Sequence, residues 1–187
     1  MTSEGRLERA PGIRPWPTIW RRIDAAARRI FPAATTLAAV VLLAFPLPIP
    51  AKAELQHGIA MASVYFWTLY RPNSMKPSVC FVIGLLVDLL GPEPPGVTMV
   101  ILLAAHGIAM RSRFRLIRQG FIAVWSSFVA VAAGCCAAEW ALTSSLDLRL
   151  LPATPALFEL VLAAGFYPLL ATVFARAHAG IAAPERA

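Results

Sequence analysis

Charge is what this sequence has least of. Charged residues make up 14% of the 187 positions, against about 25% in an ordinary soluble domain, while 58% of the positions are hydrophobic. Residues 31–50 and 119–138 contain no charged residue at all. About 20 helical residues are needed to cross a hydrocarbon core of about 30 Å, and buried helices of soluble proteins seldom stay uncharged for so long. The scarcity of charge therefore excludes a soluble domain and predicts an all-α integral membrane protein.

Catalytic motifs are missing as well. The chain contains no G-x-S-x-G, H-E-x-x-H, P-loop or G-x-G-x-x-G pattern. Its three cysteines, Cys80, Cys135 and Cys136, lie in apolar segments and lack C-x-x-C spacing, so we interpret them as packing residues. We therefore expect no enzymatic activity, no metal site and no cofactor.

Proline and glycine divide the apolar chain into six segments, because proline lacks an N–H group and ends most helices. We predict six short transmembrane helices, at residues 31–50, 55–70, 77–91, 96–110, 120–143 and 155–176. A hairpin rich in glycine and proline joins the third span to the fourth. Because the second to fourth spans are shorter than usual crossings, an alternative is that the third and fourth form one re-entrant hairpin.

Basic residues concentrate on alternate connecting segments. Of the 17 lysines and arginines, only Lys52 and Arg149 fall on the side opposite to all the others. Cytoplasmic loops carry such an excess of basic residues. We therefore interpret the net charge of +7 as an orientation signal rather than a nucleic-acid site. Both termini are predicted to be cytoplasmic, with a basic tail at 1–30, the membrane domain at 31–176 and a short tail at 177–187.

The end of the basic tail has the pattern of an amphipathic helix. Ile19, Ile23, Ala26, Ala27 and Ile30 share one helical face. The opposite face carries four arginines: Arg21, Arg22, Arg28 and Arg29. An anionic leaflet attracts each such arginine by about 1 kcal/mol. We expect these arginines to contact anionic lipids; the simpler alternative is an orientation signal without a helix.

Few ionisable residues fall inside the predicted spans, where each costs roughly 2.5–3.5 kcal/mol to insert. Asp88 either anchors another helix or a partner, or reaches the outer water. Together with Glu139 and Glu159 it forms either an acidic cluster suited to a cation or proton, or three separate solvated ends. Separate ends are favoured, since nothing in the sequence brings the three together. His57 has no companion at ligand spacing, and small residues around Gly134 would allow a second helix to approach closely.

A series of short motifs gives the chain a resemblance to a known family. Tyr70-Arg71-Pro72 is followed by Gly84-Leu85-Leu86-Val87-Asp88-Leu89-Leu90, and then by Pro92 and Pro95-Gly96. In this order, and in the basic loop Arg111-Ser112-Arg113-Phe114, the chain resembles the rod shape-determining protein MreD family. The resemblance covers residues 33–176.

The resemblance implies a multi-pass protein of the bacterial inner membrane without catalytic activity. Its implied fold is similar to the substrate-binding subunits of energy-coupling-factor vitamin transporters. Its implied role is a scaffold of the cell-elongation machinery, which binds MreC and links it to RodA and its transpeptidase, and indirectly to MreB. Candidate partner-binding residues are Tyr70, Arg71, Pro72, Gly84, Asp88 and Gly134.

The residues of the chain also allow a second function. A membrane subunit that binds a small, vitamin-like molecule would need a cavity of about 300–1,000 Å³ with converging polar groups. The fifth and sixth predicted spans offer few such groups: Glu139, Trp140, Thr143 and Glu159.

Overall fold

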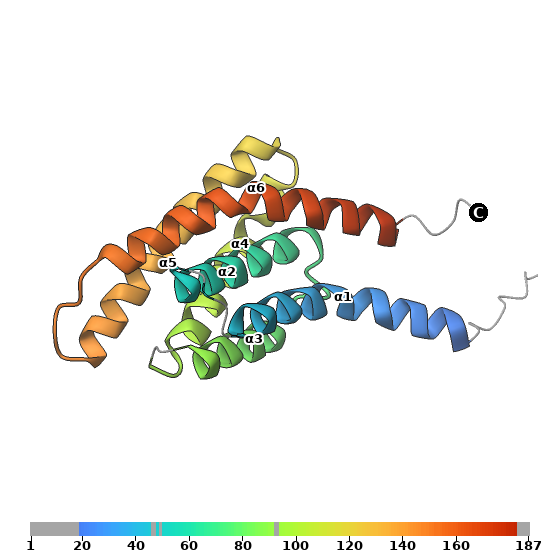
Figure 1. The fold of residues 1–187 in the computed structure, drawn as a ribbon. Coiled ribbons are helices and arrows are strands. Elements are labelled where there is room, and N and C mark those ends of the chain that lie inside the picture. The colour runs from blue at the N-terminus through green and yellow to red at the C-terminus, as the bar shows by residue number, and fades with distance from the viewer. Residues whose placement is uncertain (1–18, 46–47, 49, 92–93, 183–187) are drawn as a thin grey trace, which may run out of the picture.

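The computed structural model describes residues 19–45, 48, 50–91 and 94–182, without the side chains of residues 19–22, 24–25 and 178–182. Most of the predicted N-terminal tail, Pro92 of the hairpin and the last five residues lie outside the described part. Within it the chain is entirely helical (Figure 1). The six helices are α1 (Ile19–Ala44), α2 (Lys52–Tyr70), α3 (Pro77–Leu90), α4 (Val97–Leu116), α5 (Phe121–Leu146) and α6 (Thr154–Ala182).

Proline and glycine correctly predicted the beginnings of α3 and α4, but not the end of the first span, which we predicted at Pro50 and which lies at Ala44. Pro77 occupies the first turn of α3, where its missing N–H costs nothing. Gly96 precedes α4 with a φ of 103°, a left-handed conformation that glycine adopts without strain. As a result α2, α3 and α5 begin and end within three residues of the predicted bounds.

Helix α1 begins before its predicted span and ends at Ala44 instead of residue 50, and two other helices run past their predicted ends. We predicted a division between tail and membrane domain at residue 30, but α1 is one continuous helix through Pro32 and ends at Ala44. Helix α4 continues beyond residue 110 to Leu116, and α6 continues beyond residue 176 to Ala182. Arg113 and Arg115 therefore lie in the last turn of α4, where positive charge stabilises the carbonyl end of a helix.

Helix α2 is the centre of the bundle. It contacts each of the other five helices, and its side chains are buried over most of its length. Its aromatic residues build the core: Tyr65 packs against Phe128 and Tyr167, whose rings stack at 4.3 Å. Because protein surrounds α2 on all sides, it can carry polar residues such as Gln56 and His57 that a lipid-facing helix would not tolerate.

Four helices are long and apolar enough to cross a membrane: Ala26–Ala44 of α1, all of α4 and α5, and Thr154–Ala177 of α6. Helix α3 is apolar but has only 14 residues, which corresponds to about 21 Å at 1.5 Å per residue. The beginning of α1 and the end of α6 point to the same end of the bundle (Figure 1). This arrangement agrees with termini on one side of a membrane.

Two prolines lie inside helices, and in both cases another helix or loop supplies the hydrogen bond that the proline removes. Proline at position i cannot donate to the carbonyl of residue i−4. For Pro32 that carbonyl belongs to Arg28, which accepts from Arg71 Nη1 at 2.9 Å. For Pro168 it belongs to Ala164, which accepts from Trp125 Nε1 at 3.0 Å. The helices therefore continue through proline because tertiary contacts satisfy the freed carbonyl groups.

Replacement of Arg71 by alanine should lower the stability of the bundle by about 1–3 kcal/mol, because the Arg28 carbonyl loses a charged donor. In a Pro32→Ala background the loss should be much smaller, since the alanine introduced there supplies a backbone N–H to the same carbonyl. Thermal unfolding of the four variants in detergent gives this double-mutant cycle. Equal losses in both backgrounds would contradict the explanation, and Arg115→Ala, at an exposed position, is the matched control.

Candidate functional site

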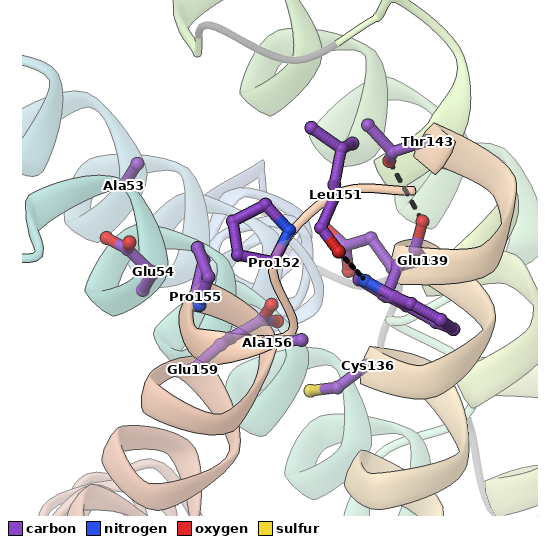
Figure 2. A pocket seen from close by; sticks show the side chains of 11 residues that line it. Ala53, Glu54, Cys136, Glu139, Thr143, Leu151, Pro152, Pro155, Ala156 and Glu159 are labelled. Atoms are coloured by element: carbon purple, nitrogen blue, oxygen red, sulfur yellow. Dashed lines mark hydrogen bonds between the residues drawn. The ribbon is translucent and has the colours of Figure 1, made fainter. Parts of the chain in front are cut away.

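A pocket of about 300 Å³ opens where the beginnings of α2 and α6 meet the end of α5 (Figure 2). Helix α5 supplies Cys136, Glu139, Trp140 and Thr143 to its wall. The remaining lining residues come from α2, from the connection 147–153 and from α6: Ala53, Glu54, Leu151, Pro152, Pro155, Ala156 and Glu159. The pocket thus lies at the opposite end of α2 from Tyr70.

The α5–α6 connection is fixed over the pocket by a tryptophan. Trp140 Nε1 donates a hydrogen bond of 3.0 Å to the carbonyl oxygen of Leu151 (Figure 2). The indole has a single N–H donor, and burial favours its pairing. Pro152 and Pro155 stiffen the same segment, because each fixes its own φ angle. The wall formed by residues 151–155 is therefore held in place relative to α5.

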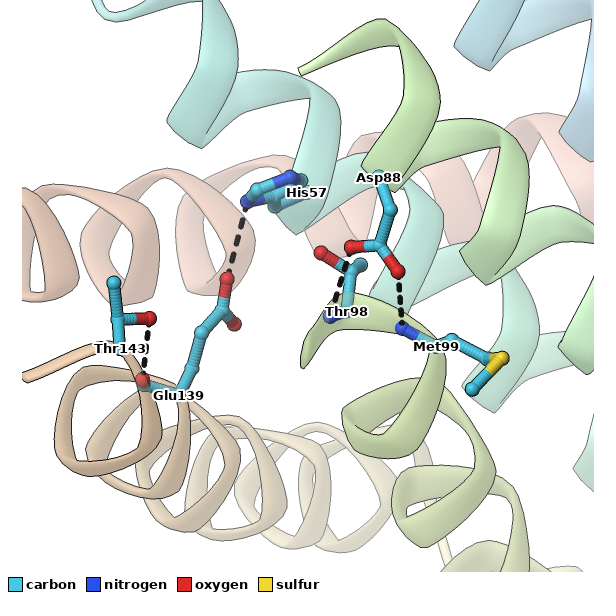
Figure 3. A network of polar contacts seen from close by, with 6 residues as sticks. All are labelled: His57, Asp88, Thr98, Met99, Glu139 and Thr143. Atoms are coloured by element: carbon cyan, nitrogen blue, oxygen red, sulfur yellow. Dashed lines mark hydrogen bonds and ion pairs between the residues drawn. The ribbon is translucent and has the colours of Figure 1, made fainter. Parts of the chain in front are cut away.

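Three ionisable side chains meet beside this pocket. His57 Nδ1 of α2 lies 3.2 Å from Glu139 Oε1 of α5 (Figure 3). One ligand atom from each of His57, Glu139 and Glu159 falls within 4.8 Å of the others, and all three residues are buried. The prediction of separate solvated ends is wrong for Glu139 and Glu159, and His57 has the companions that its sequence neighbours do not provide.

The chemistry of this group follows from its composition. Two carboxylates and one imidazole can hold a metal ion, share a proton, or bind a positively charged group of a ligand. Burial strengthens each of these options, because charges in a low dielectric need a partner. Glu139 and Glu159 reach the pocket directly, whereas His57 joins them from the central helix. The expectation that the protein binds no metal stays a prediction.

Asp88 does not belong to this group. Its Oδ2 accepts hydrogen bonds from the backbone N–H groups of Gly96 (2.8 Å) and Met99 (3.2 Å), and its Oδ1 accepts one from Thr98 (3.0 Å; Figure 3). The first N–H groups of a helix need acceptors, and the cap residue Gly96 has no side chain to provide one. Asp88 is therefore a buried cap that joins α3 to α4, rather than a solvated carboxylate.

Gly84 explains why α3 and α4 lie so close together. A Cβ atom on Gly84 would lie 2.5 Å from the Cα of Met99, which is a clash with backbone. Only glycine permits this approach, and the approach brings the start of α4 within reach of Asp88, one turn further along α3. Gly84 and Asp88 thus form one packing unit inside the chain.

The other predicted site residues lie elsewhere. Tyr70, Arg71 and Pro72 are found with Arg28 and Arg29 at the opposite end of the bundle from the pocket of Figure 2. Arg21 and Arg22 lie in α1, but their side chains are outside the described part of the structure. Gly134 is exposed in a shallow groove of about 430 Å³ between α4 and α5, with open space beside it.

Sequence reasoning missed His57 as a site residue, although a signal was present. Gln56 and His57 are adjacent polar residues in a predicted span, and polar residues at membrane depth usually face protein or a cavity. Both are buried on α2. The spacing of 82 residues to Glu139 hides the pairing until the helices are placed in space.

Loss of the Asp88 carboxylate should destabilise the α3–α4 hairpin. We expect Asp88→Leu to lower the free energy of unfolding by on the order of 3 kcal/mol, because three backbone N–H groups lose a charged acceptor. Asp88→Asn keeps one carbonyl oxygen and should lose less. Thermal unfolding in detergent measures both, with Asp147→Leu at an exposed position as control. A wild-type midpoint for Asp88→Leu would refute the capping role.

Comparisons with protein-family models, curated proteins and solved structures found no match to this chain. The two ends of α2 differ in their residues: a pocket beside buried carboxylates and a histidine lies at one end, and a group of arginines lies at the other.

Proposed function

We propose that the chain is a non-enzymatic scaffold of the MreD type in the bacterial cytoplasmic membrane. In this proposal it spans the membrane six times in the manner of the energy-coupling-factor substrate-binding subunits, with both termini in the cytoplasm. It binds MreC and couples it to RodA and its transpeptidase, and indirectly to MreB. The support comes from the motif residues and from one exposed groove.

The motif residues support the proposal because they act together. Gly84, Asp88 and Gly96 come from the region that resembles the MreD family, and they build one close helix pair. Arg71 of the Arg-Pro motif hydrogen-bonds to α1. Residues of the Arg-Pro motif, the α3 motif and the following turn thus pack helices against one another.

The segments that connect the helices are short, so a partner protein is recognised mainly by the helices within the membrane. From α2 to α6, no connecting segment has more than seven residues. A partner that meets this part of the chain therefore contacts mainly helix faces. Helix association in a bilayer depends on small residues that permit close approach and on a few polar groups.

The groove between α4 and α5 is the observation that carries the proposal. Its α5 wall consists largely of small residues, with Gly134 exposed among them. Ser127 adds a hydroxyl group, which is hydrogen-bonded to Tyr65 at 3.1 Å. A single transmembrane helix, such as the one span of MreC, matches this combination of small side chains and one polar group. The groove is lined by Ile101, Ala104, Ile108, Ser127, Ala130, Val131, Gly134, Cys135 and Ala138.

Filling the groove should weaken partner binding without disturbing the fold. We expect Gly134→Leu to reduce co-purification of MreC several-fold, because the added side chain occupies the space of the partner helix. Gly165→Leu is the matched control: Gly165 is also exposed on its helix with open space beside it, but it lies on α6. Quantitative mass spectrometry after mild solubilisation measures the yield. Equal recovery of MreC with both variants would refute the groove as the binding surface.

The pocket of Figure 2 favours a second candidate, the membrane subunit of a transporter for a small, vitamin-like molecule. Its volume of about 300 Å³ lies at the lower end of the range for such sites. Glu139 and Glu159 supply converging polar groups, and Trp140 supplies an aromatic wall. A ligand with a basic or hydrogen-bond-donating group would suit them.

This second function predicts a bound metabolite in the purified protein. Native mass spectrometry should then detect a small molecule in the wild-type chain, together with ATPase subunits among the co-purified proteins. Glu159→Gln should release that molecule, because the variant loses the negative charge that faces the pocket. Glu54→Gln, at the less buried rim, should retain more of it. A wild-type protein without any bound molecule would remove the support for transport.

A further inference from the structure

Four arginines surround a second pocket, at the end of the bundle predicted to face the cytoplasm. This basic pocket has a volume of about 510 Å³ and is lined by residues from three separate segments. Helix α1 supplies Arg28 and Arg29, the α2–α3 connection supplies Arg71, and α4 supplies Arg113. The remaining lining residues are Tyr70, Pro72, Asn73 and Ser74, so no acidic side chain is among them.

Two of the four arginines are held in place by backbone contacts. Arg71 Nη1 donates to the carbonyl of Arg28 at 2.9 Å, and Arg113 Nε donates to the carbonyl of Leu69 at 2.7 Å. A guanidinium group has five N–H donors in a fixed plane, so one such bond orients it and leaves further donors for a ligand. The pocket thus brings together positive charge from α1, the α2–α3 connection and α4.

Positive charges that line one space attract an anion. An anion placed among the four guanidinium groups gains a favourable Coulomb interaction with each of them. Phosphate fits best, because its oxygens accept paired N–H bonds from the planar guanidinium group. The Asn73 amide and the Ser74 hydroxyl are further donors on the pocket wall.

The surroundings of the basic pocket favour a lipid as the source of the phosphate. The ring of Tyr70, which is partly exposed, lines the pocket, and α1, which supplies two of the arginines, also carries the exposed apolar side chain of Ile30. A lipid can place its headgroup among the arginines and its acyl chains along these side chains, which a free phosphate ion cannot do. Basic pockets between helices on the cytoplasmic side bind anionic headgroups in this way.

We propose that the basic pocket formed by Arg28, Arg29, Arg71 and Arg113 binds the phosphate headgroup of an anionic phospholipid. This differs from a diffuse attraction of the N-terminal segment to the membrane, because it requires residues from the α2–α3 connection and α4. It also does not depend on the proposed scaffold role, since the groove between α4 and α5 is built from other residues.

Native mass spectrometry of the full-length protein tests the basic pocket. The probes are phosphatidylglycerol, phosphatidylcholine and inorganic phosphate, each added to protein stripped of lipid by detergent exchange. We expect one phosphatidylglycerol to be retained in preference to phosphatidylcholine, and inorganic phosphate at millimolar concentration not to displace it. The variant Arg28→Gln/Arg29→Gln should weaken retention roughly thirtyfold, because each arginine contributes about 1 kcal/mol of attraction.

The control is Arg115→Gln/Arg118→Gln, which removes the same charge from exposed positions that do not line the basic pocket. Equal weakening by the two double variants would show that overall charge binds the lipid, and would overturn the site. Displacement by inorganic phosphate would overturn the assignment to a lipid. Arg71→Lys keeps the charge but loses the planar donor group, so unchanged retention in this variant would also contradict the proposed phosphate geometry.

Discussion

The hydrogen bond from Arg71 to the Arg28 carbonyl replaces one that Pro32 removes, and the same principle recurs throughout the bundle. A bilayer offers no water to unpaired backbone groups, so each must find a partner within the protein. Trp125 donates a hydrogen bond to the carbonyl freed by Pro168, and Arg113 donates one to a carbonyl in the last turn of α2. Asp88 accepts hydrogen bonds from the N–H groups at the start of α4. Lys52 donates to the carbonyl groups of Ala44 and Phe45 at the end of α1. Lys52 is one of the two basic residues predicted to lie on the side opposite to the other fifteen, and this contact gives it a structural role at that position.

The two ends of α2 have opposite electrostatic character. At its first turns, His57 meets Glu139 and Glu159, and at its last residue the arginines converge. Between them lies a core of aromatic rings that includes Tyr65 and Phe128. A central helix shielded by five neighbours makes this separation feasible, because each polar group meets protein rather than lipid.

Helix beginnings were predictable from the sequence where proline or glycine precedes or opens a helix, as at Pro77 and Gly96. The course of α1 was not predictable at Pro32, where the local rule favours a break and a distant arginine removes the reason for it. The same limit applies to the pocket of Figure 2. Four of its lining residues were noticed as polar groups in apolar segments, namely Glu139, Trp140, Thr143 and Glu159. The contact between His57 and Glu139 could not be predicted, because it depends on the rotation of two helices about their axes. Asp88 was correctly considered as a helix anchor, and only the structure identifies the N–H groups of α4 as its partners.

The buried position of α2 has a consequence for how the chain is made. During synthesis, helices enter the bilayer in order from the N-terminus, and each is sorted by its own hydrophobicity. Helices α1, α4, α5 and α6 meet the length and hydropathy needed for this, whereas α2 does not, because of its polar first turns. Helix α2 therefore depends for its final surroundings on α4 and α6, which are translated later. Until those helices are made, only α1 and α3 are present to contact α2.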